Sequence, residues 1–444
     1  MGAVRVLLIS TYELGRQPFG LASPAAWLRA AGHQVTLADL SRSPLPHPAV
    51  EQAELIGFFL PMHTATRLFV KVVERVKSAN PTAHLCAYGL YAPLNEPLLR
   101  DAGISTVVGG EFEQPLLDLV GQAARVPPSQ ISLARQQFQV PDRAGLPPLA
   151  SYARLVRDGS TRTVGYTEAS RGCKHKCRHC PVVPVYNGVF RVVQSDVVLE
   201  DIRRQVAAGA EHITFGDPDF FNGPAHALKI VEALHREWPS LTYDVTVKIE
   251  HLLNHRDLLA PLKTTGCAFI TSAVESLDDA VLEKLAKGHT RAGFLEALQL
   301  TRTAGLPLAP TFIPFTPWTT LDSYRAFLTD LAELDLAGQV APIQLAIRLL
   351  IPEGSLLLEV PEIRGLTESF DSRALCYPWR HPDPAVDRLH RSIQSLIQRE
   401  ERLHRTRAEI FQRIGALVFE APFPVDAPRV SRAAIPYLTE PWYC

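Results

Sequence analysis

Two runs of alternating strand and helix patterns, separated by a proline-rich stretch, constrain the fold of this chain more than any other feature. In the first run, apolar segments typical of strands buried on both faces occupy residues 4–9, 34–40, 54–60, 83–88 and 104–108. Helical patterns alternate with them at 24–31, 65–78, 93–102 and 113–124. This alternation predicts a parallel, doubly wound Rossmann-like sheet over residues 1–125, with its ligands at the carboxyl ends of the strands.

The proline-rich stretch over 126–162 interrupts every periodic pattern and predicts a linker at a domain boundary. The alternation then restarts, with strands expected at 163–170, 212–215, 242–247, 267–274, 308–313 and 342–349. Six strand–helix units predict a partial (β/α)6 barrel over 163–355 and not a closed eight-stranded one. An arginine-rich helical pattern at 385–414 and a proline-rich tail from residue 421 predict a helical C-terminal extension over 356–444.

Composition excludes several classes of protein. Hydrophobic residues make up 46% of the 444 residues and charged residues 20%, so most of the chain is folded and not disordered. The formal net charge of −1 argues against a broad surface for nucleic acid or anionic membrane. The first ten residues lack the pattern of a signal peptide, and no apolar run reaches the roughly 18 residues of a membrane span. We therefore expect a cytoplasmic protein.

Three of the seven cysteines, Cys173, Cys177 and Cys180, fall within eight residues, just after the first strand of the second domain. Three thiolates on one short loop can hold three corners of a cubane iron–sulfur cluster and leave the fourth iron open. The two lysines and one arginine of the loop are expected to lower the thiol pKa values. Zinc is the alternative, with His175 or His179 as a further ligand, but the second cysteine pair typical of zinc sites is absent.

The run 170–180, SRGCKHKCRHC, at the end of the first strand of a six-unit β/α domain resembles the radical S-adenosylmethionine (radical SAM) superfamily. The resemblance implies that Cys173, Cys177 and Cys180 bind a 4Fe–4S cluster whose open iron chelates the methionyl group of SAM. Reductive cleavage of SAM then usually gives a 5′-deoxyadenosyl radical, with electrons from an external flavodoxin- or ferredoxin-type donor. His179 takes the family's aromatic position beside the adenine; a solvated loop residue is the alternative.

Other strand ends add candidates for cofactor binding. Gly216 and Asp217 follow the second strand, where the family has a Gly/Glu-type edge that contacts the methionyl amine; an Asx turn is the alternative for Asp217. Glu275, in a stretch that resembles the G-x-E-S of the larger cobalamin-associated branch, is expected to approach the bound cofactor. Arg348 precedes a Pro-Glu-Gly-Ser turn at the sixth strand and is expected to pair with the methionyl carboxylate, or else to form a plain salt bridge.

The order of Rossmann-like domain, proline-rich segment and radical SAM barrel resembles cobalamin-binding radical SAM proteins over roughly residues 4–355. Residues 107–113, VVGGEFE, resemble the V-x-G-E-x-E stretch that closes their first domain. The Asp-x-His-x-x-Gly motif that supplies an axial histidine to cobalt is absent, and His63 is the only histidine near the expected position. Cobalamin is therefore expected either to bind without a histidine or to have been lost. No Gly-x-Gly-x-x-Gly motif is present, which argues against a nicotinamide cofactor.

These observations favour a radical SAM enzyme that modifies a small molecule or metabolite, with methyl or alkyl transfer if cobalamin is bound. The first alternative is an RNA-modifying enzyme similar to methylthiotransferases. Those relatives carry further cluster cysteines in the first domain, where this chain has only Cys86, and a basic RNA-binding tail. The second alternative is a non-enzymatic cobalamin or cluster sensor, although no recognisable output module follows the barrel.

The last residues, LTEPWYC over 438–444, resemble the tail of the radical SAM group named for a Cys-Sec-Ala-Glu-Pro or Cys-Cys-Ala-Glu-Pro ending. The resemblance implies a selenoprotein whose selenocysteine codon after Cys444 was read as a stop. Cys444 would then belong to a catalytic site for redox cycling or for a thiophilic metal or metalloid, and the complete tail would fold toward the barrel mouth. The alternative is that Cys444 ends the native chain, and the codon that follows it decides between the two.

Overall fold

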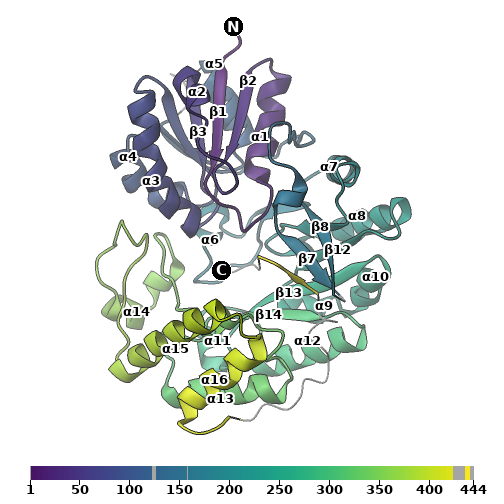
Figure 1. Ribbon diagram of the computed structural model, residues 1–444, viewed down its shortest axis with the longest axis vertical. Helices are drawn as coiled ribbons and strands as arrows, with labels where there is room; N and C mark the ends of the chain where they lie inside the picture. The colour runs from purple at the N-terminus through teal and green to yellow at the C-terminus, as the bar shows by residue number, and fades with distance from the viewer. Residues whose placement is uncertain (1, 123–126, 158, 424–435, 441–444) are drawn as a thin grey trace.

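The computed structural model describes residues 2–122, 127–157, 159–423 and 436–440, and these form an N-terminal α/β domain above a half-barrel with a helical C-terminal region (Figure 1). In the described residues, no helix combines the length and the apolar character needed to cross a membrane. The predicted fold class is confirmed.

The N-terminal domain is built on a parallel six-stranded sheet in the order β2-β1-β3-β4-β5-β6. Its strands are β1 (Arg5–Ser10), β2 (Gln34–Asp39), β3 (Leu55–Phe59), β4 (His84–Tyr88), β5 (Thr106–Gly110) and β6 (Ser129–Ser132). The first five confirm the predicted strands. The sixth lies within the stretch expected to be a linker, because a short polar edge strand of alternating exposure carries no apolar signal.

Helices cover both faces of this sheet: α1 (Phe19–Ala30), α2 (His47–Gln52), α3 (His63–Ala79), α4 (Glu96–Asp101) and α5 (Glu113–Gln122). Helix α1 begins five residues before the predicted helix and contains Pro24. A proline lacks the N–H that would bond to the carbonyl four residues earlier, here Gly20. The buried Tyr88 hydroxyl donates to that carbonyl at 2.9 Å, so the helix continues through the proline with the acceptor satisfied.

The second domain is a curled seven-stranded sheet in the order β14-β13-β12-β11-β8-β7-β15. Its strands are β7 (Arg154–Arg157), β8 (Ser160–Thr167), β11 (His212–Phe215), β12 (Thr242–Thr246), β13 (Cys267–Glu275), β14 (Leu308–Phe312) and β15 (Tyr437–Leu438). Strands β8 and β11–β14 are parallel, whereas β7 and β15 extend the edge in antiparallel pairs. Five parallel strands thus form a half-barrel.

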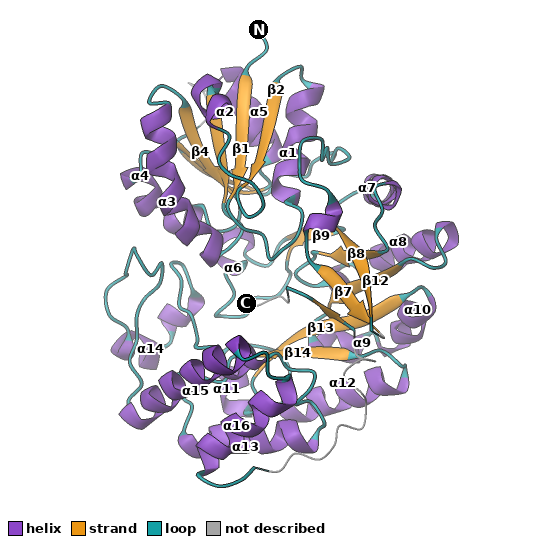
Figure 2. Ribbon diagram, in the orientation of Figure 1, coloured by secondary structure: helices purple, strands orange, loops and turns teal. Residues whose placement is uncertain are grey.

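Helices pack on the outer face of the half-barrel (Figure 2). They are α7 (Ser195–Ala207), α8 (Pro224–Glu237), α9 (Ile249–Asn254), α10 (Leu259–Thr264), α11 (Asp279–Lys284), α12 (Arg291–Thr303) and α13 (Leu321–Glu333). The strands turn buried apolar side chains such as Ile213, Tyr243 and Ile270 into this helical layer. Because side chains alternate along a strand, the positions between them face the concave side.

The predicted sixth barrel strand at 342–349 is wrong. Residues Pro342–Leu345 form a 3-10 helix, and only Arg348 makes a bridge, to Phe315. At the edge of β14 the Gln344 side-chain oxygen accepts a hydrogen bond from the Phe312 N–H at 2.9 Å, so a side chain satisfies a backbone donor that a sixth strand would have used.

The helical extension divides into α14 (Pro361–Leu366), α15 (Pro384–Arg402) and α16 (Arg407–Phe419). The single predicted helical stretch breaks between α15 and α16. His404 adopts a left-handed backbone there (φ 55°), and Thr406 with Glu409 forms a capping box that starts α16.

Candidate radical SAM site

The cysteine loop begins at β9 (Ser170–Gly172), ends at α6 (Val183–Tyr186) and crosses the carboxyl ends of the barrel strands. Asn222, after β11, accepts a hydrogen bond from the Lys174 N–H at 3.2 Å. Further along, the Arg178 N–H donates to the Leu285 carbonyl at 3.0 Å. The Ser355 hydroxyl donates to the Arg178 carbonyl at 2.9 Å. The loop is therefore fastened to segments that follow three different strands.

The three thiols lie close together; Cys177 is buried, and Cys173 and Cys180 are partly exposed. Burial raises the pKa of Cys173 to about 11 and that of Cys180 to about 12, and the neighbouring Cys177 adds to both shifts. The prediction that the loop lysines lower these values is wrong, because both lysine side chains are exposed. The cation that faces the thiols is the buried Lys287, which acts against the raised pKa of Cys180. One ammonium cannot neutralise three neighbouring thiolates. The site therefore favours a bound group with positive charge of its own, such as the irons of a cluster.

His179 and Glu275 meet at the centre of the site. The His179 Nε2 lies 3.0 Å from Glu275 Oε1, and Lys287 Nζ lies 3.3 Å from the same oxygen. Burial alone would raise the pKa of Glu275, but Lys287 and His179 hold it at about 2, so the carboxylate is charged. Glu275 also has a left-handed backbone (φ 70°), a strain that aims its side chain at the loop.

Several buried polar atoms around this carboxylate have no hydrogen-bond partner among the described residues. They are His179 Nδ1 and both ring nitrogens of His289. Burial, followed by the charges of Lys287 and Lys248, lowers the pKa of His289 to about 4, so this ring is neutral. Unpaired buried donors and acceptors are uncommon in folded proteins, so these atoms suit a polar ligand such as SAM.

Gly216 and Asp217 sit against the start of the loop. The Asp217 carboxylate accepts from the Ala169 N–H at 2.9 Å and from the Ser170 hydroxyl at 2.5 Å. Burial raises the pKa of Asp217 to about 7 despite these bonds. A Cβ on Gly216 would lie 1.8 Å from the Tyr166 hydroxyl, so only glycine fits. Both residues shape the loop, and a contact of Asp217 with the methionyl amine stays a prediction.

Arg348 is held by the C-terminal extension. Its guanidinium donates to Asp387 at 2.6 Å and to the Trp379 carbonyl at 2.9 Å, and it stacks on the Trp379 ring at 3.6 Å. This is the plain salt bridge named as the alternative, and a role for Arg348 toward the methionyl carboxylate stays a prediction.

A cavity of about 80 Å³ opens on the concave face of the half-barrel. Its lining mixes apolar side chains, such as Phe269, Leu308 and Leu438, with hydroxyl, amide and charged groups; the latter include Arg16, Thr214, Asp244, Thr246, Thr271, Thr311, Gln339, Gln344 and Arg407. Thr311 Oγ1 and Gln344 Nε2 are buried in this lining without a hydrogen-bond partner among the described residues, as is Arg16 Nε. Tyr437 and Leu438 of β15 close one side. The half-barrel thus keeps a partly apolar space in which several buried polar atoms have no hydrogen-bond partner among the described residues.

Arg171 joins the two domains and is a functional candidate that the sequence did not reveal. Its guanidinium is 6% exposed and lies 3.1 Å from Glu111, 2.7 Å from Glu113 and 2.7 Å from Glu168. Glu111 and Glu113 follow β5, and Arg171 lies two residues before Cys173. The only sequence signal was the acidic run that closes the first domain. The carboxyl end of the N-terminal sheet is thereby fixed against the cluster loop.

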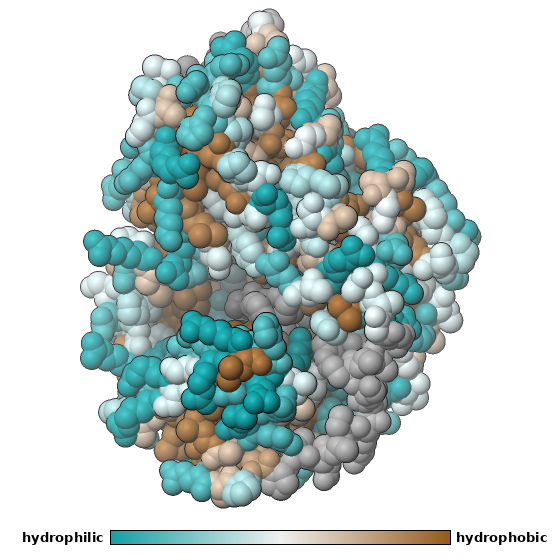
Figure 3. Space-filling view, viewed as in Figure 1, coloured by the Kyte–Doolittle hydropathy of each residue, from teal (hydrophilic) through white to brown (hydrophobic). Residues whose placement is uncertain are grey.

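The carboxyl end of β1 provides further unpaired polar atoms: Ser10 Oγ, Glu13 Oε2 and Gln17 Oε1 are buried without a hydrogen-bond partner among the described residues. Figure 3 shows the surface hollowed where the N-terminal domain meets the C-terminal helices. His63 Nε2 lies 2.7 Å from the Ala374 carbonyl, so this ring is engaged by the C-terminal extension. The carboxyl edge of this sheet suits a polar cofactor. The His63 ring is not positioned to bind cobalt, because its Nε2 contacts the Ala374 carbonyl.

The tail reaches the site between the domains. Strand β15 pairs with β7, and the Tyr12 hydroxyl donates to Glu440 at 2.5 Å. Cys444 lies outside the described residues, so its catalytic role and the selenocysteine ending stay predictions.

The comparisons with known proteins agree with this geometry. The sequence model of the radical SAM superfamily matches residues 167–330, from the end of β8 into α13. Residues 167–330 therefore carry the sequence pattern of the radical SAM superfamily. This match confirms the radical SAM assignment predicted for that region, with a 4Fe–4S cluster and SAM as its cofactors.

Within the superfamily, solved cobalamin-dependent members share the fold. OxsB, determined with aqua-cobalamin and SAM bound, has a TM-score of 0.72 and 15% identity, over 89% of this chain and 67% of OxsB. The methyltransferase TsrM of Kitasatospora setae, determined with cobalamin and a 4Fe–4S cluster, has a TM-score of 0.62 and 15% identity, over 81% of this chain and 78% of TsrM.

Among curated sequences, the hopanoid C-3 methylase of Methylococcus capsulatus is 24% identical over 330 residues. The match covers 70% of this chain and 64% of the methylase, so this chain spans less than two thirds of that relative. A putative methylthiotransferase of Methanocaldococcus jannaschii is 25% identical over 187 residues, 38% of this chain and 40% of the relative.

Proposed function

We propose that this protein is a cobalamin-dependent radical SAM methyltransferase that modifies a small polar molecule. The proposal rests on the ion pairs of Arg171 with Glu111 and Glu113. They hold the carboxyl end of the N-terminal sheet against the cysteine loop. Two cobalamin-dependent enzymes share this two-domain fold, and a methylase is among the curated relatives.

In this proposal each residue has a defined task. Cys173, Cys177 and Cys180 hold the cluster, and the Lys287 ammonium offsets its negative charge. The charged Glu275 fixes the His179 ring through a 3.0 Å contact and leaves His179 Nδ1 free to meet a ligand. When bound, the cofactors supply the electron transfer and the methyl carrier, while the protein orients them and excludes water. The electron comes from an external flavodoxin- or ferredoxin-type partner.

The substrate class follows from the concave cavity. Threonine hydroxyls, glutamine amides and apolar side chains line it; Arg16 and Arg407 contribute positive charge and Asp244 a negative charge. A buried donor left unpaired is unfavourable by about 1–3 kcal/mol, so the cavity favours a ligand that pairs with these groups. We propose a small substrate with a carboxylate or other anionic acceptor, in contrast to the hopanoid named for the curated methylase.

RNA modification is the second candidate, because the curated relatives include a threonylcarbamoyladenosine tRNA methylthiotransferase and two tRNA-2-methylthio-N(6)-dimethylallyladenosine synthases. The formal net charge of −1 does not favour this reading. Tight, salt-sensitive binding of tRNA would favour it over a small-molecule substrate.

Anaerobic reconstitution of the full chain tests the proposal. We expect about four irons per chain, a cobalamin absorption spectrum that stays with the protein after gel filtration, and transfer of a deuterated methyl group from labelled SAM to a small molecule of a cell extract. Cys177→Ala should abolish iron loading, whereas Cys376→Ala, outside the loop, should not. An iron-loaded protein that retains no cobalamin would contradict the methyltransferase proposal while leaving the radical SAM assignment intact.

A further inference from the structure

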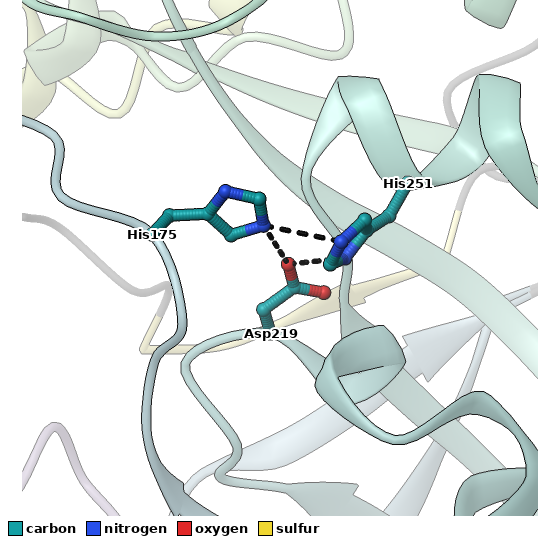
Figure 4. Close-up of side chains that lie close together, drawn as sticks. All are labelled: His175, Asp219 and His251. Carbon is teal, nitrogen blue, oxygen red and sulfur yellow. Dashed lines mark hydrogen bonds and ion pairs between the residues drawn. The ribbon is translucent and has the colours of Figure 1, made fainter. Parts of the chain in front are cut away.

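Three side chains from three separate segments converge beside the cysteine loop (Figure 4). His175 comes from the loop between the first two cluster cysteines, Asp219 from the turn after β11, and His251 from α9. One potential ligand atom of each lies within 4.8 Å of the others. From the sequence, His175 is expected only as an alternative ligand of the cysteine site.

The distances match a single metal ion. His175 Nε2 lies 3.7 Å from Asp219 Oδ2 and 3.1 Å from His251 Nε2, and His251 Nδ1 lies 2.7 Å from Asp219 Oδ2. Zinc–nitrogen and zinc–oxygen bonds of about 2.0–2.1 Å in a tetrahedron place neighbouring ligands about 3.3 Å apart. The distances of Asp219 Oδ2 to His175 Nε2 and to His251 Nδ1 lie on both sides of that value, whereas the 3.1 Å contact involves the other nitrogen of His251, which could not bind the same ion.

The Asp219–His251 contact is not an ordinary hydrogen bond. Asp219 Oδ2 and His251 Nδ1 lie 2.7 Å apart, yet neither has a partner of hydrogen-bond geometry among the described residues. Both side chains are at least nine-tenths buried, with exposures of 2% and 4%. Two buried polar atoms this close, neither with a partner of hydrogen-bond geometry, suit a cation between them.

Two imidazoles and one carboxylate, with further positions open, are a ligand set used for zinc and for ferrous iron. We propose that His175, Asp219 and His251 bind one divalent transition-metal ion of the zinc class, separate from the cluster. The ion ties the cysteine loop to the turn after β11 and to α9, so it positions the loop that carries the cluster ligands.

Lys248 and Glu250 define the surroundings of this site. Lys248 Nζ lies 3.1 Å from His175 Nδ1, and Glu250 Oε2 lies 3.7 Å from the same nitrogen. An ammonium this close to the His175 ring repels a second cation bound to the same ring. Glu250 supplies a carboxylate beside the ring, as is common behind a ligating histidine. Lys248 competes with the metal.

The test uses the full chain with its cluster reconstituted anaerobically. One equivalent of Zn²⁺ is added, the protein is desalted, and iron and zinc are measured by mass spectrometry. We expect about four irons and one zinc per chain in the wild type. His251→Gln and Asp219→Asn should keep the iron and weaken zinc binding more than tenfold. His255→Gln is the matched control, because this ring lies 5.8 Å from the His251 ring and is not a ligand.

Two further measurements keep the test decisive. Lys248→Met should tighten zinc binding, a gain that misfolding cannot produce. Co²⁺ in place of Zn²⁺ should give a spectrum of nitrogen and oxygen ligands without thiolate charge-transfer bands. Zinc retained by His251→Gln and Asp219→Asn, zinc binding unchanged or weakened in Lys248→Met, or thiolate bands that vanish in Cys173→Ala would overturn the proposal.

Discussion

Replacing Arg171 with Met tests whether one buried guanidinium holds the two domains together. Arg171 is 6% exposed and pairs with Glu111, Glu113 and Glu168, and its guanidinium lies 4.9 Å from the centre of the Phe112 ring. Removing one partner of a buried ion pair costs about 3–5 kcal/mol, because the remaining charge stays buried. Three carboxylates would lose their cation here, so we expect a loss at the upper end of that range.

The loss depends on pH in a defined direction. Burial and the charge of Glu113 raise the pKa of Glu111 to about 7 against the opposing effect of Arg171. A carboxyl whose pKa is raised on folding adds stability below its unfolded value of 4.5, and that stability is lost as pH rises through about 7. The wild type should therefore lose some stability between pH 5 and pH 8. Arg171→Met should lose most at pH 8 and recover toward pH 6, as the carboxylates take up protons.

Urea unfolding followed by circular dichroism at both pH values measures the effect, with the midpoint as the readout if the transition is not two-state. The matched control is Arg203→Met, an arginine that also bridges two glutamates but is 48% exposed, where pairs contribute little. The reasoning is refuted if Arg171→Met and Arg203→Met shift the midpoint equally at pH 8, or if the Arg171→Met loss grows at pH 6.

Three other predictions concern the cluster loop. Glu275→Gln removes the charge that faces Lys287 and His179, and should weaken SAM binding about tenfold by equilibrium dialysis, or about 1.4 kcal/mol. Because the pKa of Glu275 is held at about 2, its contribution to stability should be lost as pH falls from 4.5 toward 2; an acid titration by circular dichroism should show this loss in the wild type and not in Glu275→Gln. Gly172→Ala would place a Cβ 2.3 Å from Tyr186 at a backbone of φ 74°, so iron per chain after reconstitution should fall to less than half of the wild-type value.

The parts of the fold that follow apolar periodicity could be predicted from the sequence. The strand His212–Phe215 and the helix Pro224–Glu237 coincide with their predicted bounds, because each presents a continuous apolar face to the core. Strand β6 was missed because an edge strand needs no buried face. The wrongly predicted sixth strand at 342–349 has an apolar sequence, as a strand would. The Gln344 side chain instead accepts a hydrogen bond from the Phe312 N–H at the edge of β14, a tertiary contact that local sequence does not indicate.

The candidate site, like the fold, could be predicted from the sequence only in part. The cysteines are close in sequence, so their spacing alone predicts the cluster. His179 and Glu275 were each nominated, but their 3.0 Å contact joins residues 96 positions apart and follows only from the path of the loop. Asp219 and His251 carry no local pattern that would pair them with His175. The loop lysines show the limit of charge counting, since exposed ammonium groups do little for buried thiols.

The polar atoms that lie unpaired in the lining of the half-barrel are the strongest argument that the cavity holds a ligand. Barrel interiors that only support a fold are filled by bulky branched side chains. Here Thr214 lies between the buried Ile213 and Phe215, and Asp244 lies between Tyr243 and Val245, so the outward positions are apolar and the inward ones polar. The Thr214 hydroxyl donates to Asp244 Oδ1 at 2.6 Å, so these two residues are paired with each other. Thr311 Oγ1 and Gln344 Nε2 in the same lining have no hydrogen-bond partner among the described residues. Because an unpaired buried polar group is unfavourable, these two atoms are explained by a polar ligand that pairs with them.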